Sequence, residues 1–453
     1  MKNLIKGTAV FFLLIVPDSL LFAQDVAITV TNSNIALVKE VRRMSLQKGV
    51  HNINLVDIPS AIRPASVLVE SKNKAFDVLE QNYEYDLINV SKVLEKSLGQ
   101  QIWVVHPELG NKSGKLLSAA SNNLILLDDE GALQIIPRSE EQRIYLKDYS
   151  KQKKTFITRP TLVWKINSRQ KGEQALQISY LTGGMDWQAD YVGRLNDTDN
   201  KLTLACWVTI DNRSGKTFNK ARLKLLAGDI QLVRPQRERR YGTTQVMEMA
   251  AKAPAFTEKE FFEYHLYTLQ RKTDLKNNQS KQIQLFPETE SSVKKIYRID
   301  SNRGDKVRVL LSFKNSQKNN LGIPLPAGDI RLYKSDGDDL EFVGADKIDH
   351  TPKDEKLEVT LGSAFDIVAE RSTIRSTKPT KRSRSQTIEY KIRNHKKEAV
   401  QVEVLQRLSA YQENKLLNSS HKVLEKKANY FKFKVAIKAD GEATLRYEYI
   451  TSW

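Results

Sequence analysis

His350 comes closest to an acid–base catalyst in this 453-residue sequence. It follows Asp349 and precedes Asp354, so a carboxylate could orient the imidazole and tune its proton affinity near neutral pH. No nucleophile stands at a fixed spacing from it, and a histidine before Thr351 and Pro352 is also typical of a loop that caps a turn. Acid–base catalysis by His350, Asp349 and Asp354 is therefore the alternative hypothesis rather than the leading one.

The other residues with catalytic or metal-binding chemistry are scattered along the chain. The six histidines form no pair at metal-ligand spacing, and the usual nucleophile, zinc-protease and nucleotide-loop motifs are absent from the sequence. Cys206 is the single cysteine, which excludes an internal disulfide, and its apolar neighbours are typical of a core residue. The acidic segment 336–341 favours a hairpin turn over a Ca²⁺ loop, because the alternating ligand pattern is missing. We expect neither a metal nor a cofactor.

Trp187 and Tyr191 follow the glycine pair Gly183-Gly184. Glycines let the backbone approach a ligand closely, so these two aromatic side chains could form a platform for sugar rings. A tryptophan near a tight corner also commonly fills the core of a β-sandwich. Core packing is the favoured interpretation, and Trp187 and Tyr191 remain candidate binding residues.

A basic stretch is the clearest sign of a binding surface. Ten Lys or Arg and one Glu lie between Arg371 and Lys397, a net charge of +9 within 27 residues, in a chain whose net charge is +18. Like charges repel one another, which favours either full solvation in a loop or an anionic partner. The candidate residues for an anionic glycan are Lys378, Lys381, Arg382 and Arg384.

The N-terminus has the pattern of a secretory signal peptide. Lys2 and Lys6 precede the apolar run 9–16, and Ala23 is a small residue suited to cleavage before Gln24. That run is too short to anchor the chain, and no later stretch approaches the roughly 20 apolar residues that cross a bilayer. We therefore expect an exported protein, periplasmic or at the outer surface, whose positive charge meets anionic glycans or a membrane surface rather than nucleic acid.

Alternating apolar and polar residues dominate the remaining sequence. The runs 26–31, 307–313 and 431–435 show this period of two, which is typical of antiparallel strands with one buried face. Helical spacing is convincing only between Leu87 and Leu98. The sequence therefore predicts a mainly β fold of tandem antiparallel β-sandwiches with one short helix.

Changes in composition divide the chain into six segments, and each has a predicted role. They are a signal peptide at 1–23, an N-terminal β domain at 24–97, a small SH3- or Sm-like barrel at 98–147, a β-sandwich at 155–233, an exposed linker or loop at 234–260 and a C-terminal β-sandwich region at 261–453. A basic, Ser/Thr-rich stretch interrupts the last segment near 371–386.

Several motifs together resemble one family. They include Asn34-Ile35-Ala36-Leu37-Val38-Lys39-Glu40 and the segments 180–191, 210–215 and 324–328. At these positions the chain resembles the domain of unknown function 4139 family, which is related to MuiA-type mucoidy inhibitors. The resemblance covers nearly the whole chain after the signal peptide and implies an exported envelope protein of mainly β fold. It brings no catalytic residues, and the long coiled-coil insertion of MuiA-like relatives is absent here.

Two functions remain open on the sequence. The leading hypothesis is an exported, non-enzymatic cell-envelope protein that binds or scaffolds other envelope proteins or anionic glycans. The alternative is a hydrolase or lyase that acts on an envelope polymer through His350 and its neighbouring carboxylates. A concave pocket with converging acid–base groups would favour the enzyme.

Overall fold

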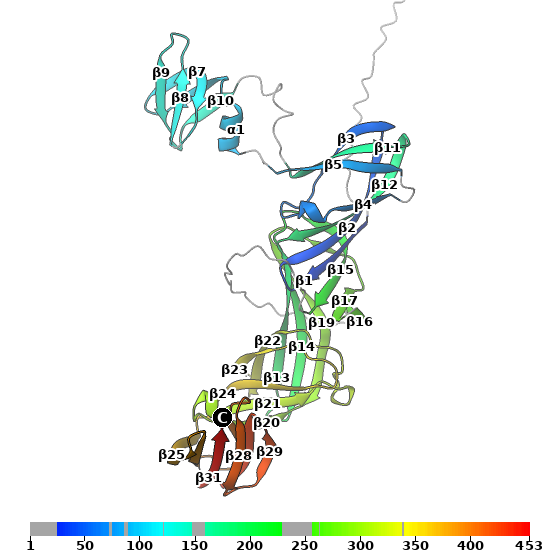
Figure 1. The fold of residues 1–453 in the computed structure, drawn as a ribbon. Coiled ribbons are helices and arrows are strands. Elements are labelled where there is room, and N and C mark those ends of the chain that lie inside the picture. Colours follow the sequence, from blue (N-terminus) through cyan, green and yellow to red (C-terminus); the bar gives the residue numbers. More distant parts are fainter. Residues whose placement is uncertain are drawn as a thin grey trace, which may run out of the picture.

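The computed structural model describes residues 25–71, 75–85, 89–120, 122–146, 159–228, 256–261, 263–337 and 339–453. The described residues form strands β1 to β31, one α-helix and three short 3-10 helices (Figure 1). This confirms the predicted mainly β fold. The predicted signal peptide lies outside the described residues.

The first sheet has eight strands and draws on distant parts of the chain. Its order is β16 (Phe256–Phe261), β17 (Tyr264–Leu269), β15 (Phe218–Ala227), β1 (Asp25–Thr31), β2 (Ile35–Leu46), β12 (Gly172–Gly183) and β4 (Leu68–Ser71), with β18 (Thr273–Leu275) paired to β15. The segments 24–97, 155–233 and 261–453 thus share one sheet, so the structure does not separate them at the predicted boundaries. Strand β16 also occupies the end of the predicted linker 234–260, whose residues 234–255 lie outside the described part.

Two further sheets pack with the first. The small sheet has the order β3 (Gly49–Val56), β11 (Thr161–Ser168) and β5 (Phe76–Glu84). The central sheet has the order β19 (Gln279–Ser292), β14 (Lys201–Asn212), β13 (Met185–Leu195), β22 (Gly328–Asp336) and β23 (Asp339–Ile348). Short 3-10 helices stand at η1 (Pro64–Ser66), η2 (Ser301–Arg303) and η3 (Gln317–Asn319).

The C-terminal part adds two sheets. The bridging sheet has the order β24 (Lys356–Ser363), β21 (Arg308–Lys314), β20 (Lys294–Asp300), β27 (Val400–Arg407), β30 (Tyr430–Ile437) and β29 (Val423–Lys427). The C-terminal sheet has the order β25 (Ile367–Thr380), β26 (Ser383–Asn394), β31 (Gly441–Ser452) and β28 (Glu413–Ser419). In Figure 1 these strands, coloured from yellow to red, lie below the long strands of the central sheet.

Pairing is antiparallel with three exceptions among the described strands. β1 pairs in parallel with β15, β13 with β22, and β20 with β27. Each exception joins strands far apart in the sequence, because parallel neighbours need a crossover connection rather than a tight hairpin. The sandwiches are therefore assembled by crossovers, which the predicted purely antiparallel pairing did not include.

Residues 89–146 form a separate unit. Helix α1 (Val90–Lys96) precedes a sheet of order β10 (Arg143–Leu146), β6 (Gln101–His106), β7 (Gly110–Ser118), β8 (Asn123–Leu127) and β9 (Leu133–Pro137). The predicted short helix is confirmed, and Asn89 caps it by accepting a hydrogen bond from the backbone N–H of Lys92. The predicted barrel is an open five-stranded meander in the described residues. Neither α1 nor a 3-10 helix is long enough to cross a membrane, and the described residues contain no other helix.

Three cores hold these sheets together. The central core joins the first, small and central sheets and reaches strands β21 and β24 of the bridging sheet. The C-terminal core lies between the other half of the bridging sheet and the C-terminal sheet, where the rings of Phe433 and Tyr447 stack at 4.6 Å. The meander has its own small core, which includes Leu94 of α1. The bridging sheet thus contributes to two cores.

An ion-pair network crosses the strands of the bridging sheet. Arg298 of β20 donates hydrogen bonds to Glu403 at 2.7 Å and to Glu358 at 3.0 Å, and Lys356 lies 2.8 Å from Glu358. The hydrogen bonds from Arg298 lower the pKa of Glu358 to about 2, although partial burial acts in the opposite direction. Glu358 therefore contributes to stability only while it is ionised.

Replacing Glu358 with Gln should lower the free energy of unfolding at neutral pH and weaken its dependence on acid. In the wild type this contribution is complete above pH 4.5, the ordinary pKa, and is lost as the pH falls to about 2. Urea unfolding at a series of pH values should show a shallower acid loss in Glu358→Gln, while Glu341→Gln, at an exposed position of β23, follows the wild type. Equal acid profiles for all three proteins would contradict the assignment.

Candidate functional site

His350 lies in the exposed turn that follows β23. Its Nδ1 atom accepts a hydrogen bond from the backbone N–H of Ala327 at 3.1 Å. The carbonyl oxygen of Asp349 accepts the hydroxyl of Thr351, and the backbone N–H of Asp354 donates to the carbonyl of Asn315. The bond from Thr351 is local, whereas the other two join this segment to Ala327 and Asn315, and all three candidates are exposed. The geometry therefore favours a structural role for His350 in this loop over acid–base catalysis.

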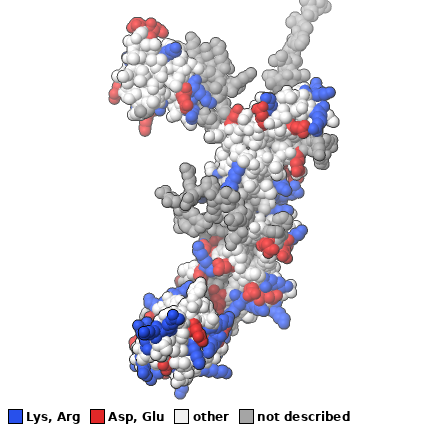
Figure 2. All heavy atoms as spheres, in the orientation of Figure 1, with Lys and Arg blue, Asp and Glu red and all other residues white. Residues whose placement is uncertain are grey.

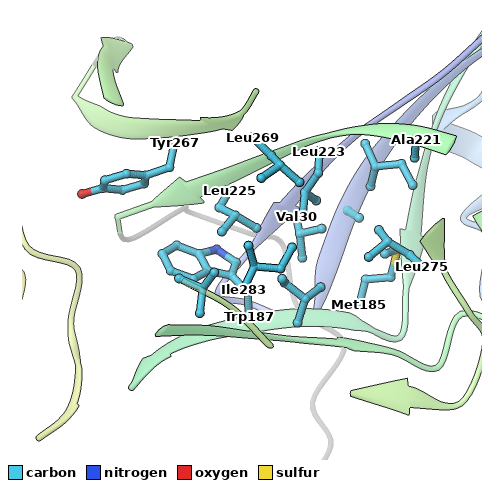
Figure 3. Packing of buried hydrophobic residues seen from close by; sticks show 14 of the residues in the cluster. Val30, Met185, Trp187, Ala221, Leu223, Leu225, Tyr267, Leu269, Leu275 and Ile283 are labelled. Carbon is cyan, nitrogen blue, oxygen red and sulfur yellow. The ribbon is translucent and has the colours of Figure 1, made fainter. Parts of the chain in front are cut away.

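Trp187 and Tyr191 lie in the central core rather than on a surface. Trp187 is 4% exposed, its indole N–H donates to the carbonyl of Leu226 at 3.2 Å, and its ring meets Tyr267 edge-on (Figure 3). Tyr191 is fully buried, and its hydroxyl donates to the carbonyl of Pro326 at 2.7 Å. The candidate sugar platform is wrong, because neither ring is accessible to a ligand. The periodicity of β13 turns both side chains inward.

The remaining weak candidates are structural as well. The acidic segment is the β22–β23 hairpin, in which Asp336 stands opposite Asp339 and Gly337 has a positive φ of 63°. Cys206 is buried in β14, and desolvation raises the pKa of its thiol well above the ordinary value, so a reactive thiolate is disfavoured. Among the described residues, no group of three or more His, Cys, Asp or Glu is placed to hold a metal ion.

The basic stretch is a long hairpin rather than a loop. Strands β25 and β26 pair from Ile367 opposite Asn394 to Thr380 opposite Ser383, which leaves Lys381 and Arg382 at the tip. Irregularities in register occur near Thr373 and Thr377. The prediction that residues 371–386 interrupt the β structure is therefore wrong. Ser and Thr have room on a solvated edge strand, where β-branched residues such as Thr are favoured.

The two strands of this hairpin differ in burial. Strand β25 is the edge of the C-terminal sheet, and its residues beyond Ala369 are exposed except for the half-buried Thr377. Strand β26 is an inner strand, paired with β25 on one edge and β31 on the other, and its Ile388 and Tyr390 are fully buried in the C-terminal core. The exposed strand β25 is thus hydrogen-bonded to the well-packed strand β26, and this pairing fixes the positions of the cations along β25.

The base and the tip of the hairpin differ in charge. Near the base, Arg393 forms an ion pair with Glu370 at 2.6 Å, and Lys396 lies 3.9 Å from Asp366. We call the tip residues Lys378, Lys381, Arg382 and Arg384 the tip cations. All four are exposed, and within the described part of the chain no carboxylate lies within 4.0 Å of them. Figure 2 shows Lys and Arg gathered over this C-terminal part of the molecule.

Comparison with known proteins gives a family but no activity. A family described as Domain of unknown function (DUF4139) matches residues 176–453, which is more than half of the chain. The chain belongs to the DUF4139 family. No curated protein matches it. The DUF4139 match begins within β12, so strands β1 to β11 precede it, although β1, β2 and β4 complete the first sheet.

A buried ionic network ties the DUF4139 region to those preceding strands. Glu40 and Arg42 stand two residues apart on β2, and the Arg42 guanidinium lies 2.7 Å from the Glu40 carboxylate. Lys216, inside the matched region, lies 3.3 Å from the same carboxylate and also donates to the carbonyl of Asp57. All three side chains are buried. The charged groups of this network are paired with one another, so we assign the network a structural role.

This network could not be predicted from the sequence, for a physical reason. Charged residues are rarely buried unless they are paired, and the partner Lys216 lies 176 positions from Glu40, so nothing local indicated that these charges fall on the same face of β2 as Val38 and Met44. Tyr180 of β12 lies nearby, and burial together with the charge of Glu40 raises its pKa well above the ordinary value. A signal that could have found the network is the position of Glu40, which ends the first of the motifs that carry the family resemblance.

Proposed function

We propose that the protein is an exported, non-enzymatic component of the cell envelope that holds an anionic polymer, such as an acidic glycan, on the β25–β26 hairpin. The observation that carries this proposal is the set of tip cations, four exposed positive charges without a described carboxylate within 4.0 Å. Repulsion among such charges is relieved when an anionic partner replaces part of their counterions.

The architecture of the hairpin supports this proposal. Binding is weakened when flexible side chains and loops must be ordered, and a strand already fixed in a sheet avoids the backbone part of that cost. Arg384 is further oriented, since its Nε donates to the hydroxyl of Ser376 at 3.1 Å. Two arginines among the four residues add forked donors that suit carboxylate, sulfate or phosphate groups.

The predicted signal peptide gives this surface its context. An exported basic protein meets the acidic polymers and lipid head groups of an envelope rather than nucleic acid. Among the sequence-predicted catalytic candidates, His350, Asp349 and Asp354 are all exposed turn residues. A binding role therefore accounts for more of the described surface than a hydrolase or lyase does.

Replacing all four tip cations with Ser should weaken binding to a polyanion by up to about a thousandfold, because each of the four cations contributes about 1 kcal/mol near an anionic surface. The measurement is retention of the full mature chain on a heparin column across a salt gradient, where screening weakens the contact. The wild type should elute at clearly higher salt than the variant. Both proteins should melt at the same temperature, since these side chains are exposed.

A control with the same change in charge tests the location of the site. Lys48, Lys171, Arg213 and Arg271 are exposed and lie outside the hairpin. Their joint replacement with Ser should leave elution close to that of the wild type. If both quadruple variants elute together, the chain binds polyanions by its overall charge alone and the hairpin is not the site.

A further inference from the structure

A pocket lies where the bridging sheet passes from one core to the other. Leu311 of β21 belongs to the central core, whereas Tyr297 of β20 belongs to the C-terminal core, and both line the pocket. Its volume is about 190 Å³. The apolar part of its wall comes from the central sheet, the bridging sheet and the segment after β24, namely Leu195, Val309, Leu311, Val343, Leu361 and Ala364. Leucine and valine side chains give this wall an aliphatic character.

Three lysines stand at the same pocket. Lys295 of β20 and Lys334 of β22 bind the two carboxylate oxygens of Asp199, at 2.7 Å and 2.6 Å. Lys396 also lines the pocket, and the nearest carboxylate, Asp366, is 3.9 Å away. All three lysine side chains are partly exposed. Positive charge therefore exceeds negative charge at the mouth of an aliphatic pocket.

Asp199 acts as a fixed brace for two of these lysines. Burial alone would raise its pKa, but the hydrogen bonds from Lys295 and Lys334 outweigh that effect and lower it. The pKa of Lys295 is correspondingly raised. Both groups stay charged at neutral pH, so the ammonium groups keep their positions. Lys396, which has the looser partner, is the lysine most able to receive a new anion.

The mouth carries one further apolar group. Phe365 follows Ala364, is 94% exposed and lines the pocket. A second hollow of about 560 Å³ shares Asp199, Lys295 and Tyr297 with the pocket and has a more polar lining. The pocket thus has an aliphatic wall, a cationic mouth and an exposed aromatic ring beside the mouth. This arrangement is complementary to a molecule with an alkyl chain and an acidic end.

We propose that this pocket binds a small anionic amphiphile, a single alkyl chain that carries a carboxylate. The chain lies against the aliphatic wall, where it removes apolar surface from water. The carboxylate lies at the mouth, where it accepts charge-assisted hydrogen bonds from Lys396 and Lys334. This site is separate from the tip cations, so the proposal does not depend on polymer binding by the hairpin.

Calorimetric titration of the full mature chain with hexanoate, octanoate, decanoate and dodecanoate tests the proposal. Affinity should rise with chain length until the pocket is filled, since each buried methylene contributes about 0.8 kcal/mol. Decylamine should bind more weakly than decanoate, because three ammonium groups repel its charge. Equal binding of decylamine and decanoate would overturn the proposal, because the lysines would then play no part.

Two variants locate the ligand. Lys396→Gln should weaken decanoate binding about tenfold, as expected for the loss of one charge-assisted hydrogen bond. Lys397→Gln is the matched control at the next position, which is exposed and does not line the pocket, and it should bind as the wild type does. Val343→Phe should fill the pocket and shorten the preferred chain. Unchanged titrations for Lys396→Gln and Val343→Phe would overturn the proposal.

Two further comparisons separate this site from other sources of binding. The variant without the tip cations should bind decanoate with wild-type affinity, so that failure of the polymer proposal and failure of this one are distinguishable. Binding to phosphatidylglycerol vesicles without any response to free decanoate would assign the lysines to a membrane surface and would overturn the proposal. Since Lys396 is partly exposed, Lys396→Gln should retain the fold, which a circular dichroism melt checks.

Discussion

Arg42→Met should lower the free energy of unfolding by about 3–5 kcal/mol, because it removes one cation from a buried ionic network and leaves the Glu40 carboxylate with only its longer contact to Lys216. The side chains of Arg42 and Glu40 are 1% and 0% exposed. Arg42 also donates to the carbonyls of Val56 and Asp57, which would lose those donors. Urea unfolding at neutral pH measures the loss.

The adjacent residue supplies the control. Arg43 forms a comparable contact with Glu173 at 3.3 Å, but these side chains are 59% and 64% exposed. Exposed pairs contribute at most about 1 kcal/mol, so Arg43→Met should have a small effect. Combining Arg42→Met with Glu40→Leu should recover part of the loss, since the buried carboxylate is then removed as well and Lys216 keeps its contact with Asp57. Equal losses for Arg42→Met and Arg43→Met would show that burial of the network does not determine its energy.

Trp187→Ala should cost a similar amount, about 3–5 kcal/mol, through the cavity that it leaves in the central core. Leu225, Tyr267 and Ile283 surround the indole and would lose its contacts (Figure 3). The carbonyl of Leu226 would also lose its donor. Thermal and urea unfolding measure the change.

A second tryptophan supplies the control for this loss of stability. Trp453 is exposed at the C-terminal end of the chain, so Trp453→Ala should leave stability nearly unchanged. Trp187→Phe should fall between the wild type and Trp187→Ala, because it retains part of the ring volume. If Trp187→Ala were as stable as the wild type, the indole would not be the core residue that its burial indicates.

The sequence predicts which residues face inward better than which strands meet. The alternation in 26–31 and 431–435 correctly indicates strands, because period two follows from strand geometry alone. It cannot name a partner, and β1 pairs in parallel with β15, whose residues lie almost 200 positions away. The segments read as consecutive sandwiches therefore share a sheet. Short-range turn chemistry did identify the β22–β23 hairpin, because its pairing is local.

The candidate binding surfaces also divide into those visible in a local pattern of the sequence and those that only the fold brings together. The basic stretch was visible because its charges are close together in the sequence. Its strand structure was not, since polar and charged residues at nearly every position conceal the period of two. The pocket lysines were invisible, because Lys295, Lys334 and Lys396 come from distant segments that only the fold brings together. Glu40 and Arg42 are charged residues on an otherwise apolar face of β2, and their partner Lys216 comes from a distant segment of the chain.

The bridging sheet makes the two larger cores a single mechanical unit. Its ladder of hydrogen bonds runs without a break from β24, which belongs to the central core, to β30, which belongs to the C-terminal core. A force or a local distortion at one end is therefore transmitted through covalently stiff, laterally bonded strands rather than through a flexible linker. The meander has its own core and no strand in this ladder, so a distortion of the bridging sheet does not reach it through a shared sheet.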